Sequence, residues 1–500
     1  MTTLKEIQKI TTLGLLKKHG YTSKSVKEEL RDNLISKLQR KEKVFEGIWG
    51  YEDTVIPDIE RAILSMHHIN LLGLRGQAKT RIARLMVELL DEYIPIVEGS
   101  ELNDDPLIPL SRFAKDLIKE KGDDTPITWI HRSERYNEKL ATPDVSVADL
   151  IGDVDPIKAA TLKLPYSDER VIHFGLIPRS NRCIFVINEL PDLQARIQVP
   201  LFNILQEGDI QIRGFKLRMP LDIQFVFTAN PEDYTNRGSI VTPLKDRIDS
   251  QIVTHYPKDI VIGRKITEQE AKVKANQKGI LVNDILKDLV EQIAVEARES
   301  EYVDAKSGVS ARMTIAAYEN LLSAAERRIL INQEKEGIAR LSDLYGAIPA
   351  INGKIELVYE GEVEGPVYVA QSLVGKAIRH EFLKYFPDPE AAKKKKENPY
   401  ADITSWFGGG REIDFLNDLE EKDYRARLLT VDGLKELVVG LFPKSDDKEQ
   451  FLLMEFALHG LAEFSMISKQ ALDKGLHFKD LFDNLFDASK FMDDEDENLY

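Results

Sequence analysis

The chain has 500 residues, of which 43% are hydrophobic and 30% are charged. This balance is typical of globular proteins, and the length is enough for two to four domains. Its 68 Lys and Arg residues against 84 Asp and Glu residues give a formal net charge of -16. Proteins that coat nucleic acid neutralise phosphates with Lys and Arg, so this charge disfavours nucleic acid as the main partner. A local basic patch or a basic ring pore is still compatible with this net charge.

Targeting and redox features favour a cytoplasmic protein. No apolar run approaches the ~20 residues that a membrane-spanning helix needs. The first 25 residues are too polar for a signal peptide and are typical of an amphipathic helix. Cys183 is the only cysteine, which excludes an intramolecular disulfide and a cysteine-based structural zinc site. We therefore expect a cytoplasmic chain that makes no membrane contact.

The first half of the chain predicts a helical start and then an αβ domain. Residues 1–45 are predicted to form two charged helices, the second capped by Ser23 or Ser25. The domain over 46–260 has its clearest strands in TPITWIH, RCIFVINEL and DIQFVFTAN, preceded by the short apolar run INLLGL. Short apolar runs that alternate with helical patterns predict a parallel sheet with helices on both faces.

The second half is predicted to be mainly helical. A period of 3.6 residues predicts an all-α domain over 261–345. A C-terminal extension over 346–500 follows. Within it, the alternation of apolar and polar residues over 353–365 indicates a β-hairpin, and the Pro, Lys and Gly residues of 387–412 predict a flexible linker. The extension ends in the acidic tail DDEDENLY.

The most specific motif is GLRGQAKT, which lies between INLLGL and the helical pattern RIARLMVELL. A strand, a glycine-containing loop and a helix are the context that the P-loop pattern requires. Lys79 would reach the β- and γ-phosphates of a nucleotide, and Thr80 would give its hydroxyl to Mg²⁺. The alternative is a strand, a turn and a helix with a chance Lys-Thr pair. The predicted phosphate-binding residues are Gly73, Gly76, Gln77, Ala78, Lys79 and Thr80, with Ala78 in place of the second glycine of the pattern.

A second apolar run ends in Asn188 and Glu189. At the end of a strand beside the loop, residue 188 would join the Mg²⁺ shell and Glu189 would polarise the attacking water. Asn188 can accept a hydrogen bond from a metal-bound water, but it lacks the negative charge that a hard cation favours. This predicts slow hydrolysis, if hydrolysis occurs. The alternative is a buried strand with a polar end.

Three later residues could also contact a nucleotide. Asn230 follows the strand DIQFVF and could orient the lytic water. Arg247 precedes the predicted strand SQIVTHY, and an arginine on a subunit edge can stabilise the transition state at a neighbour's ATP. Arg312 opens a helix of the α-domain and could reach the γ-phosphate. Each is a weak signal alone, so the prediction depends on their order after one P-loop.

Together these motifs resemble AAA+ ATPases of the helix-2-insert clade, especially the magnesium chelatase ATPase subunit and MoxR-type proteins. The similarity covers about half of the chain, from Gly50 to Arg312, and includes LIGDVD, FGLIPRSNR and LQARIQVPLFNILQEG. It implies an insert in the second helix around LIGDVD and a β-hairpin insert near DIQIRGF. The implied fold is an α/β P-loop core followed by an all-α lid domain and a mostly helical extension.

The resemblance also implies roles for single residues. Lys79 and Thr80 would bind phosphate and metal, Asn188 and Glu189 would form Walker B, Asn230 would be sensor one, Arg247 the arginine finger and Arg312 sensor two, while Arg179 or Arg182 could act in trans. The implied cofactors are ATP and Mg²⁺. The implied partners are further copies in a ring, a hexamer by expectation, and a separate protein with a von Willebrand A domain.

Three functions follow from these observations. The first is a motor ATPase that remodels a partner or loads metal into it. The second is a nucleotide-gated scaffold with slow or no hydrolysis, which Ala78 and Asn188 favour. The third is a DNA-dependent ATPase, although the sequence shows no helix-turn-helix module, no G-A-F-T-G-A loop and no basic domain.

Overall fold

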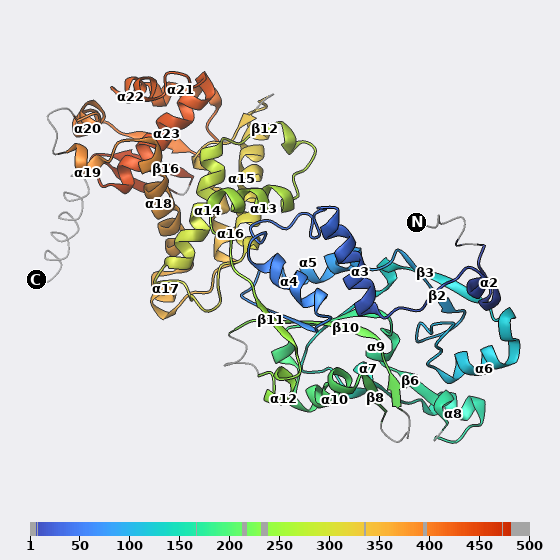
Figure 1. The fold of residues 1–500 in the computed structure, drawn as a ribbon. Coiled ribbons are helices and arrows are strands. Elements are labelled where there is room, and N and C mark those ends of the chain that lie inside the picture. The colour runs from blue at the N-terminus through green and yellow to red at the C-terminus, as the bar shows by residue number, and fades with distance from the viewer. Residues whose placement is uncertain are drawn as a thin grey trace, which may run out of the picture. The chain divides into compact units, whose positions relative to one another are not determined.

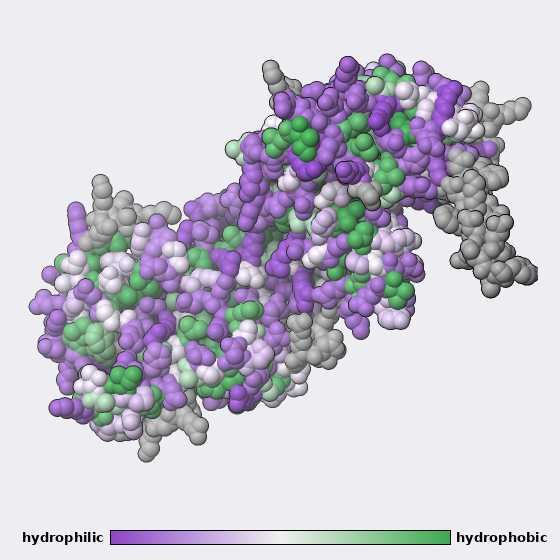
Figure 2. Space-filling model, turned by 180° about the vertical axis from the view of Figure 1, so that it is seen from behind, coloured by the Kyte–Doolittle hydropathy of each residue, from purple (hydrophilic) through white to green (hydrophobic). Residues whose placement is uncertain are grey.

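The computed structural model describes residues 7–481 except 8, 167, 213–217, 232–238, 335–336, 394–397 and 473. The chain divides into two compact units, Met1–Tyr256 and Pro257–Tyr500, coloured from blue to green and from yellow-green to red in Figure 1. The face in Figure 2 is mostly hydrophilic, with separate hydrophobic groups between hydrophilic ones. No helix in the described part of the chain has both the length and the apolarity of a membrane span.

A five-stranded parallel sheet forms the centre of the first unit, in the order β11-β1-β10-β7-β4. Successive residues of β7 belong to two different hydrophobic clusters, with Phe185 and Ile187 in one and Ile184 and Val186 in the other. Both faces of the sheet are therefore covered, as the continuous apolar runs predict. The strands are β1 (Ile69–Leu72), β4 (Tyr136–Leu140), β7 (Cys183–Asn188), β10 (Ile223–Ala229) and β11 (Ser250–Val253).

The segment TPITWIH forms a strand, but outside this sheet, and that part of the prediction is wrong. It becomes β3 (Ile127–His131), which pairs antiparallel with β2 (Tyr93–Val97). One edge of the parallel sheet is β4, whose sequence YNEKL is polar and partly exposed. An edge strand has only one neighbour and meets solvent, so it can lack the apolar run that marks a central strand.

The described residues of the N-terminal region include two helices, α2 (Leu13–Lys18) and α3 (Val26–Gln39). Ser25 caps the second one: its hydroxyl accepts a hydrogen bond from the backbone N–H of Glu28, whose carboxylate accepts one from the N–H of Ser25. Glu29 on this helix forms a buried ion pair of 2.7 Å with Arg135, next to β4. The helix is thereby fixed to the αβ core.

Two short antiparallel strand pairs lie where the resemblance implies insertions. The first, β5 (Gly152–Val154) and β6 (Ile172–Phe174), encloses α8 (Pro156–Leu162). The second, β8 (Asp209–Gln211) and β9 (Arg218–Pro220), follows α10. The remaining helices of this unit are α4 (Val55–Leu64), α5 (Lys79–Leu85), α6 (Arg112–Lys121), α7 (Val147–Leu150), α9 (Leu176–Arg179), α10 (Ala195–Glu207) and α12 (Thr242–Lys245).

The second unit begins with the helices predicted over 261–345. They are α13 (Ile260–Glu270), α14 (Asp284–Glu299) and α15 (Ala311–Ile331), with the short parallel pair β12 (Ile280–Leu281) and β13 (Gly337–Ile338). The C-terminal part is also mainly helical but contains a three-stranded antiparallel sheet, in the order β14-β16-β15, that the sequence analysis missed. The C-terminal part includes α16 (Ile348–Asn352), α18 (Pro366–Tyr385), β14 (Ile413–Leu416), α21 (Glu421–Leu429), α22 (Leu434–Leu441), α23 (Asp447–Glu463), β15 (Ser468–Leu472) and β16 (Gly475–Lys479). The acidic tail lies outside the described residues.

The hairpin predicted over 353–365 is wrong. The first half of this segment begins with a turn at Gly353 and Lys354 and makes only an isolated bridge, between Leu357 and Val303. The second half is helix α17 (Tyr359–Glu364), directly followed by α18, which begins at Pro366. Proline is favoured at the first position of a helix, and a short alternation of residues cannot by itself separate helix from strand.

The prediction of a flexible linker over 387–412 is also wrong for the residues that the structure describes; 394–397 lie outside them. This segment contains α19 (Pro389–Ala392) and α20 (Ala401–Gly408). Tyr400, Ile403 and Phe407 are fully buried in the core of the second unit. Their spacing of three and four residues is that of one helix face, which the surrounding Lys, Pro and Gly residues obscure in the sequence.

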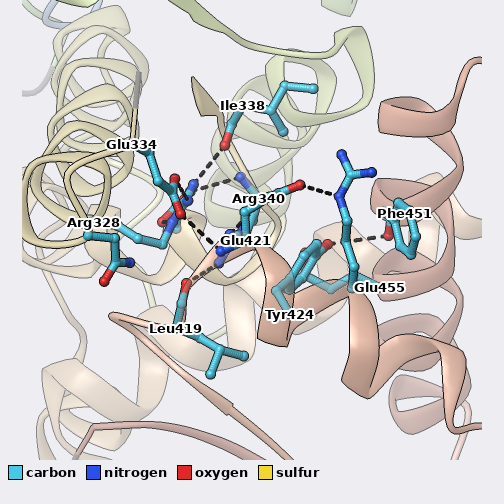
Figure 3. Close-up of polar contacts among 12 residues, drawn as sticks. Arg328, Glu334, Ile338, Arg340, Leu419, Glu421, Tyr424, Phe451 and Glu455 are labelled. Carbon is cyan, nitrogen blue, oxygen red and sulfur yellow. Dashed lines mark hydrogen bonds and ion pairs between the residues drawn. The ribbon is translucent and has the colours of Figure 1, made fainter. Parts of the chain in front are cut away.

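Buried polar contacts join the predicted lid region to the C-terminal extension (Figure 3). The guanidinium of Arg340 donates to the carbonyl of Leu419 and to Glu421, both at 2.7 Å. It also lies over the ring of Tyr424, whose hydroxyl donates to Glu455 at 2.9 Å. One hydrophobic cluster extends from α14 to β16. Residues 261–345 and 346–481 therefore share one core.

Glu291 on α14 gives the second unit a pH-dependent stability. Its carboxylate accepts a hydrogen bond of 2.5 Å from Thr267 on α13, and burial raises its pKa to about 7. Because this pKa lies above the value in an unfolded chain, the carboxyl group stabilises the fold fully below about pH 4.5, and this contribution is lost as the pH rises through 7.

We therefore expect Glu291→Gln, which keeps a neutral hydrogen-bonding group, to stabilise the second unit at pH 8 by about 3 kcal/mol and to give little gain at pH 4.5. Urea unfolding at the two pH values measures the difference. Glu299→Gln, an exposed change on the same helix, is the control and should show no such pH dependence. Equal effects of Glu291→Gln at both pH values would contradict the prediction.

Candidate nucleotide-binding site

The predicted site residues come together at one edge of the parallel sheet. Lys79 follows the loop after β1, Asn188 and Glu189 end β7, and Asn230 directly follows β10. The parallel register pairs Leu72 with Ala229, so that these three strands end at the same level. Ligands of open α/β sheets bind at this carboxyl edge.

Lys79 is held among oxygen atoms of its own loop. Its ammonium donates hydrogen bonds to the carbonyls of Gly73 and Leu74, the latter at 3.0 Å, and to Oδ1 of Asn230 at 2.7 Å. The side chain is buried, with only 7% exposed. The ammonium that a phosphate would attract thus lies among the carbonyls of the loop. Lys79 is itself the first residue of α5.

Close packing makes glycine necessary at position 73. A Cβ atom there would lie 2.0 Å from the hydroxyl of Thr254 and 2.2 Å from Oε1 of Gln77. These two groups are hydrogen-bonded to each other at 2.7 Å. The hydroxyl of Tyr51 lies 3.1 Å from the carbonyl of Gln77, and burial raises its pKa to about 12. Thr254 and Tyr51 therefore fix the shape of the loop.

Neither Thr254 nor Tyr51 was among the residues predicted from the sequence. Thr254 could have been found by the rule that located Asn188 and Asn230, because it directly follows a strand of the sheet. Tyr51 lies far from the loop in sequence, and no motif marks it.

Ala78 adopts the left-handed conformation that its place in the loop requires. Its backbone angles are φ 56° and ψ 14°, and it is the N-cap residue of α5. Gly76 also has a positive φ, of 74°. A side chain disfavours this conformation by roughly 1–2 kcal/mol, since Cβ approaches the following carbonyl oxygen. The loop therefore has the expected course, with strain at one residue.

Thr80 and Asn188 form the part of the site that fits Mg²⁺. The hydroxyl of Thr80 donates to Oδ1 of Asn188 at 3.2 Å, and both side chains are partly exposed. Both can offer neutral oxygen atoms, and Mg²⁺ commonly binds few protein oxygens while it keeps waters and phosphate oxygens. Within the described ranges, no group of three or more His, Cys, Asp or Glu residues could hold a metal ion.

Asn230 connects the lysine to the acidic residue. While its Oδ1 accepts from Lys79, its Nδ2 donates to Oε2 of Glu189 at 3.1 Å. Only 6% of Asn230 is exposed, so one buried amide contacts both charged groups. Glu189 itself has a left-handed backbone, with φ 55° and ψ 51°. The carboxylate and the loop cation are thus placed on either side of a single amide.

The two predicted arginines Arg247 and Arg312 belong to different units. Arg247 contacts its own unit: it donates to Gln206 at 2.9 Å and to the carbonyl of Pro243 at 2.7 Å. Arg312 lies in the first turn of α15, in the second unit. The roles of Arg247 as arginine finger and of Arg312 as sensor two remain predictions.

Of the two arginines proposed to act in trans, Arg182 does not fit that role. It is buried, with 4% exposed, pairs with Asp105 at 3.2 Å and donates to the carbonyl of Pro95 at 2.8 Å. Arg179 is exposed at the end of α9. Burial of Arg182 follows from its position directly before the central strand β7, where the side chain can pack inside the unit.

Comparisons with known proteins find similarity among solved structures only. No protein-family model and no curated protein matches the chain. A chain of the complex between subunits BchI and BchD of magnesium chelatase is 19% identical, with 64% of this chain and 98% of that one covered and a TM-score of 0.33. NtrX from Brucella abortus, bound to ADP, is 13% identical over 70% of this chain and 72% of its own, with a TM-score of 0.35. A RuvB mutant of Thermotoga maritima is 11% identical over 81% and 94%, with a TM-score of 0.33.

At such identities and TM-scores, these likenesses carry no argument about function. The fold is established by features of the chain itself. The phosphate loop follows the inner strand β1, polar residues end the neighbouring strands, two antiparallel insertions lie at the implied places, and a predominantly helical unit follows. These features confirm the predicted α/β P-loop fold of the AAA+ type.

The strained residue of the loop gives a direct test of this geometry. Ala78→Gly removes the Cβ atom at a left-handed position, so we expect it to stabilise the first unit by about 1 kcal/mol. Ala83→Gly, within helix α5, is the matched control and should destabilise the unit by about 1 kcal/mol or more. Urea unfolding of both variants measures whether each substitution raises or lowers the free energy of unfolding. Destabilisation by both changes would mean that Ala78 is not left-handed.

Proposed function

We propose that this chain, which has the fold of AAA+ ATPases, binds ATP at the carboxyl edge of its sheet and hydrolyses it slowly. The observation that supports this best is the amide of Asn230, which contacts both Lys79 and Glu189. A phosphate-binding cation and a carboxylate that can act on water are thereby held within one site. Neither contact follows from the loop motif alone.

Each residue of the site would have a separate role in hydrolysis. Lys79 would exchange its carbonyl partners for the β- and γ-phosphate oxygens, while the loop N–H groups hold the phosphates. Bound Mg²⁺, held by Thr80 and through Asn188, would neutralise phosphate charge. Glu189 would accept a proton from the attacking water as the bond to the γ-phosphorus forms. The bond to the β-phosphate oxygen breaks, which gives ADP and inorganic phosphate.

Two features support slow turnover. Asn188 contributes no negative charge to the metal shell, so Mg²⁺ is held less firmly than by a carboxylate. One carboxylate oxygen of Glu189 is occupied by a hydrogen bond from Asn230, which competes with its action on water. The same two features support the second candidate, a nucleotide-gated scaffold that binds ATP and assembles without hydrolysing it. ATP binding by a wild-type chain without turnover would favour the scaffold.

The proposed action on other molecules rests on the sequence resemblance. We propose a hexameric cytoplasmic ring that remodels a separate partner with a von Willebrand A domain, or loads metal into it. Nucleic acid as the main partner is disfavoured by the net charge of -16. A DNA-dependent ATPase stays as a third alternative, and stimulation of turnover by DNA would distinguish it.

Binding and hydrolysis can be separated by two substitutions. Lys79→Ala removes the cation inside the loop and should weaken ATP binding at least about tenfold, because a charge-assisted contact to phosphate is lost. Glu189→Gln should leave binding nearly unchanged and reduce turnover about 100-fold or more, since the amide cannot accept the proton. A fluorescent ATP analogue measures affinity and phosphate release measures turnover.

Lys119→Ala, an exposed change on α6, is the matched control for lysine removal and should alter neither quantity. Unchanged ATP affinity of Lys79→Ala would overturn the phosphate-loop assignment. Unchanged turnover of Glu189→Gln would overturn the role of the carboxylate while leaving ATP binding intact.

The proposed ring places Arg247 at a neighbour's ATP. To act there, its guanidinium must leave Gln206 and Pro243 and form paired hydrogen bonds with the γ-phosphate. Arg247→Ala subunits and Lys79→Ala subunits should each be inactive. When they are mixed, some interfaces combine an intact loop with an intact arginine, so part of the ATPase activity should return.

Native mass spectrometry of the mixture establishes that mixed oligomers have formed and how many subunits they hold. Restored activity in mixed oligomers supports action in trans. Mixed oligomers without any restored activity, or an active wild-type monomer, would exclude it.

A further inference from the structure

Thr228 contacts both Asn188, the last residue of β7, and Glu189, which follows it. No sequence motif assigns Thr228 a role. It is the sixth residue of β10, and only 1% of it is exposed. Its hydroxyl makes two contacts with the end of β7. The backbone N–H of Glu189 donates to it at 3.0 Å, and it donates to Oδ1 of Asn188 at 3.3 Å.

The first contact holds an unfavourable backbone. Glu189 has a positive φ of 55°, which a residue with a side chain adopts at a cost of roughly 1–2 kcal/mol. Such conformations persist where the surroundings fix them. The hydrogen bond from its N–H to Thr228 is such a constraint, and the carbonyl of Glu189 accepts a second bond from Asp192 at 2.9 Å. This turn determines where the side-chain carboxylate of Glu189 lies after the end of β7.

The second contact fixes the orientation of an amide. A hydroxyl carries one proton, and the N–H of Glu189 occupies one of its lone pairs. The proton is donated to Oδ1 of Asn188, which is the acceptor in this contact. Oδ1 is also the atom that accepts from Thr80 at 3.2 Å. Thr228 thus turns the oxygen of Asn188, rather than its NH₂ group, toward the metal side of the site.

We propose that Thr228 is a positioning residue of the ATPase site: one buried hydroxyl holds the turn that directs Glu189 and the amide oxygen that faces Thr80. It acts through its contacts with Asn188 and Glu189. The inference rests on the proposed function and extends it, because it names the group that makes two adjacent residues act together. The competing explanation is that the hydroxyl only satisfies buried polar groups at the end of the sheet.

A pair of substitutions separates the hydroxyl from the shape of the side chain. Thr228→Val keeps the branched shape and removes the hydroxyl, whereas Thr228→Ser keeps the hydroxyl. We expect Thr228→Val to lower kcat for ATP by about 10- to 100-fold, because a misplaced base loses much of its effect. KM for ATP should change less than about twofold, since Lys79 and the loop are untouched. Thr228→Ser should keep most of the wild-type kcat.

A second measurement does not depend on hydrolysis. Hydrogen exchange followed by mass spectrometry reports on the amide of Glu189 in the peptide 183–193. Its protection should be lost in Thr228→Val and kept in Thr228→Ser, without nucleotide. Thr254→Val is the matched control: it also removes a buried hydroxyl beside the site, but one that contacts Gln77 in the loop. It should raise KM and leave exchange in 183–193 unchanged.

Each result decides the inference. Lower kcat with unchanged KM, faster exchange in 183–193 and rescue by serine support it. An equal loss of kcat in Thr228→Ser, or unchanged exchange in a folded Thr228→Val, would overturn it. If the wild-type chain has no turnover, hydrolysis as a proposed function fails, and the exchange comparison still decides whether Thr228 holds the turn.

Discussion

The register between the parallel strands β1, β10 and β7 is the constraint on which the site depends. Leu72 lies beside Ala229, and Phe227 beside Ile187, so the three strands end together. The residues that follow are then adjacent although more than 100 positions separate Lys79 from Asn188. A shift of one residue in a strand would turn its side chains to the opposite face of the sheet. The buried apolar faces that fix the register therefore also fix the contacts of Lys79, Asn230 and Glu189.

The predictable part of this site follows from the same constraint. The spacing of glycine, lysine and threonine after an apolar strand predicted the loop, and polar residues directly after apolar runs predicted Asn188, Glu189 and Asn230. Tyr51 and Thr228 were not predictable in this way. One approaches the loop from a distant segment, and the other is an inward-facing hydroxyl within an apolar strand, where threonine is also a common strand former. Their roles depend on distances that no linear pattern contains.

Errors in the fold have a similar origin. Composition predicted a linker over 387–412, but three residues at helical spacing bury that segment in a core. Alternation predicted a hairpin over 353–365, but the chain turns helical before Pro366. The polar strand β4 gave no signal because it lies at the sheet edge. In each case tertiary packing decided between local structures that the sequence allows, while the long apolar strands and long helices were predicted correctly.

The shared core of the second unit has a mechanical consequence for the predicted sensor. Arg312 lies on α15, and a later turn of the same helix carries Arg328, which is buried and pairs with Asp343 at 2.8 Å. Arg340, three residues before Asp343, reaches Glu421 in the C-terminal region. The pair of Arg328 with Asp343 is buried, and removing one partner of a buried pair leaves an uncompensated charge at a cost of about 3–5 kcal/mol. Glu421 is 38% exposed, so its pair with Arg340 contributes less. A displacement of α15 thus moves the extension with it more readily than it separates them. The helix that carries Arg312 therefore shares one hydrophobic core with the C-terminal region.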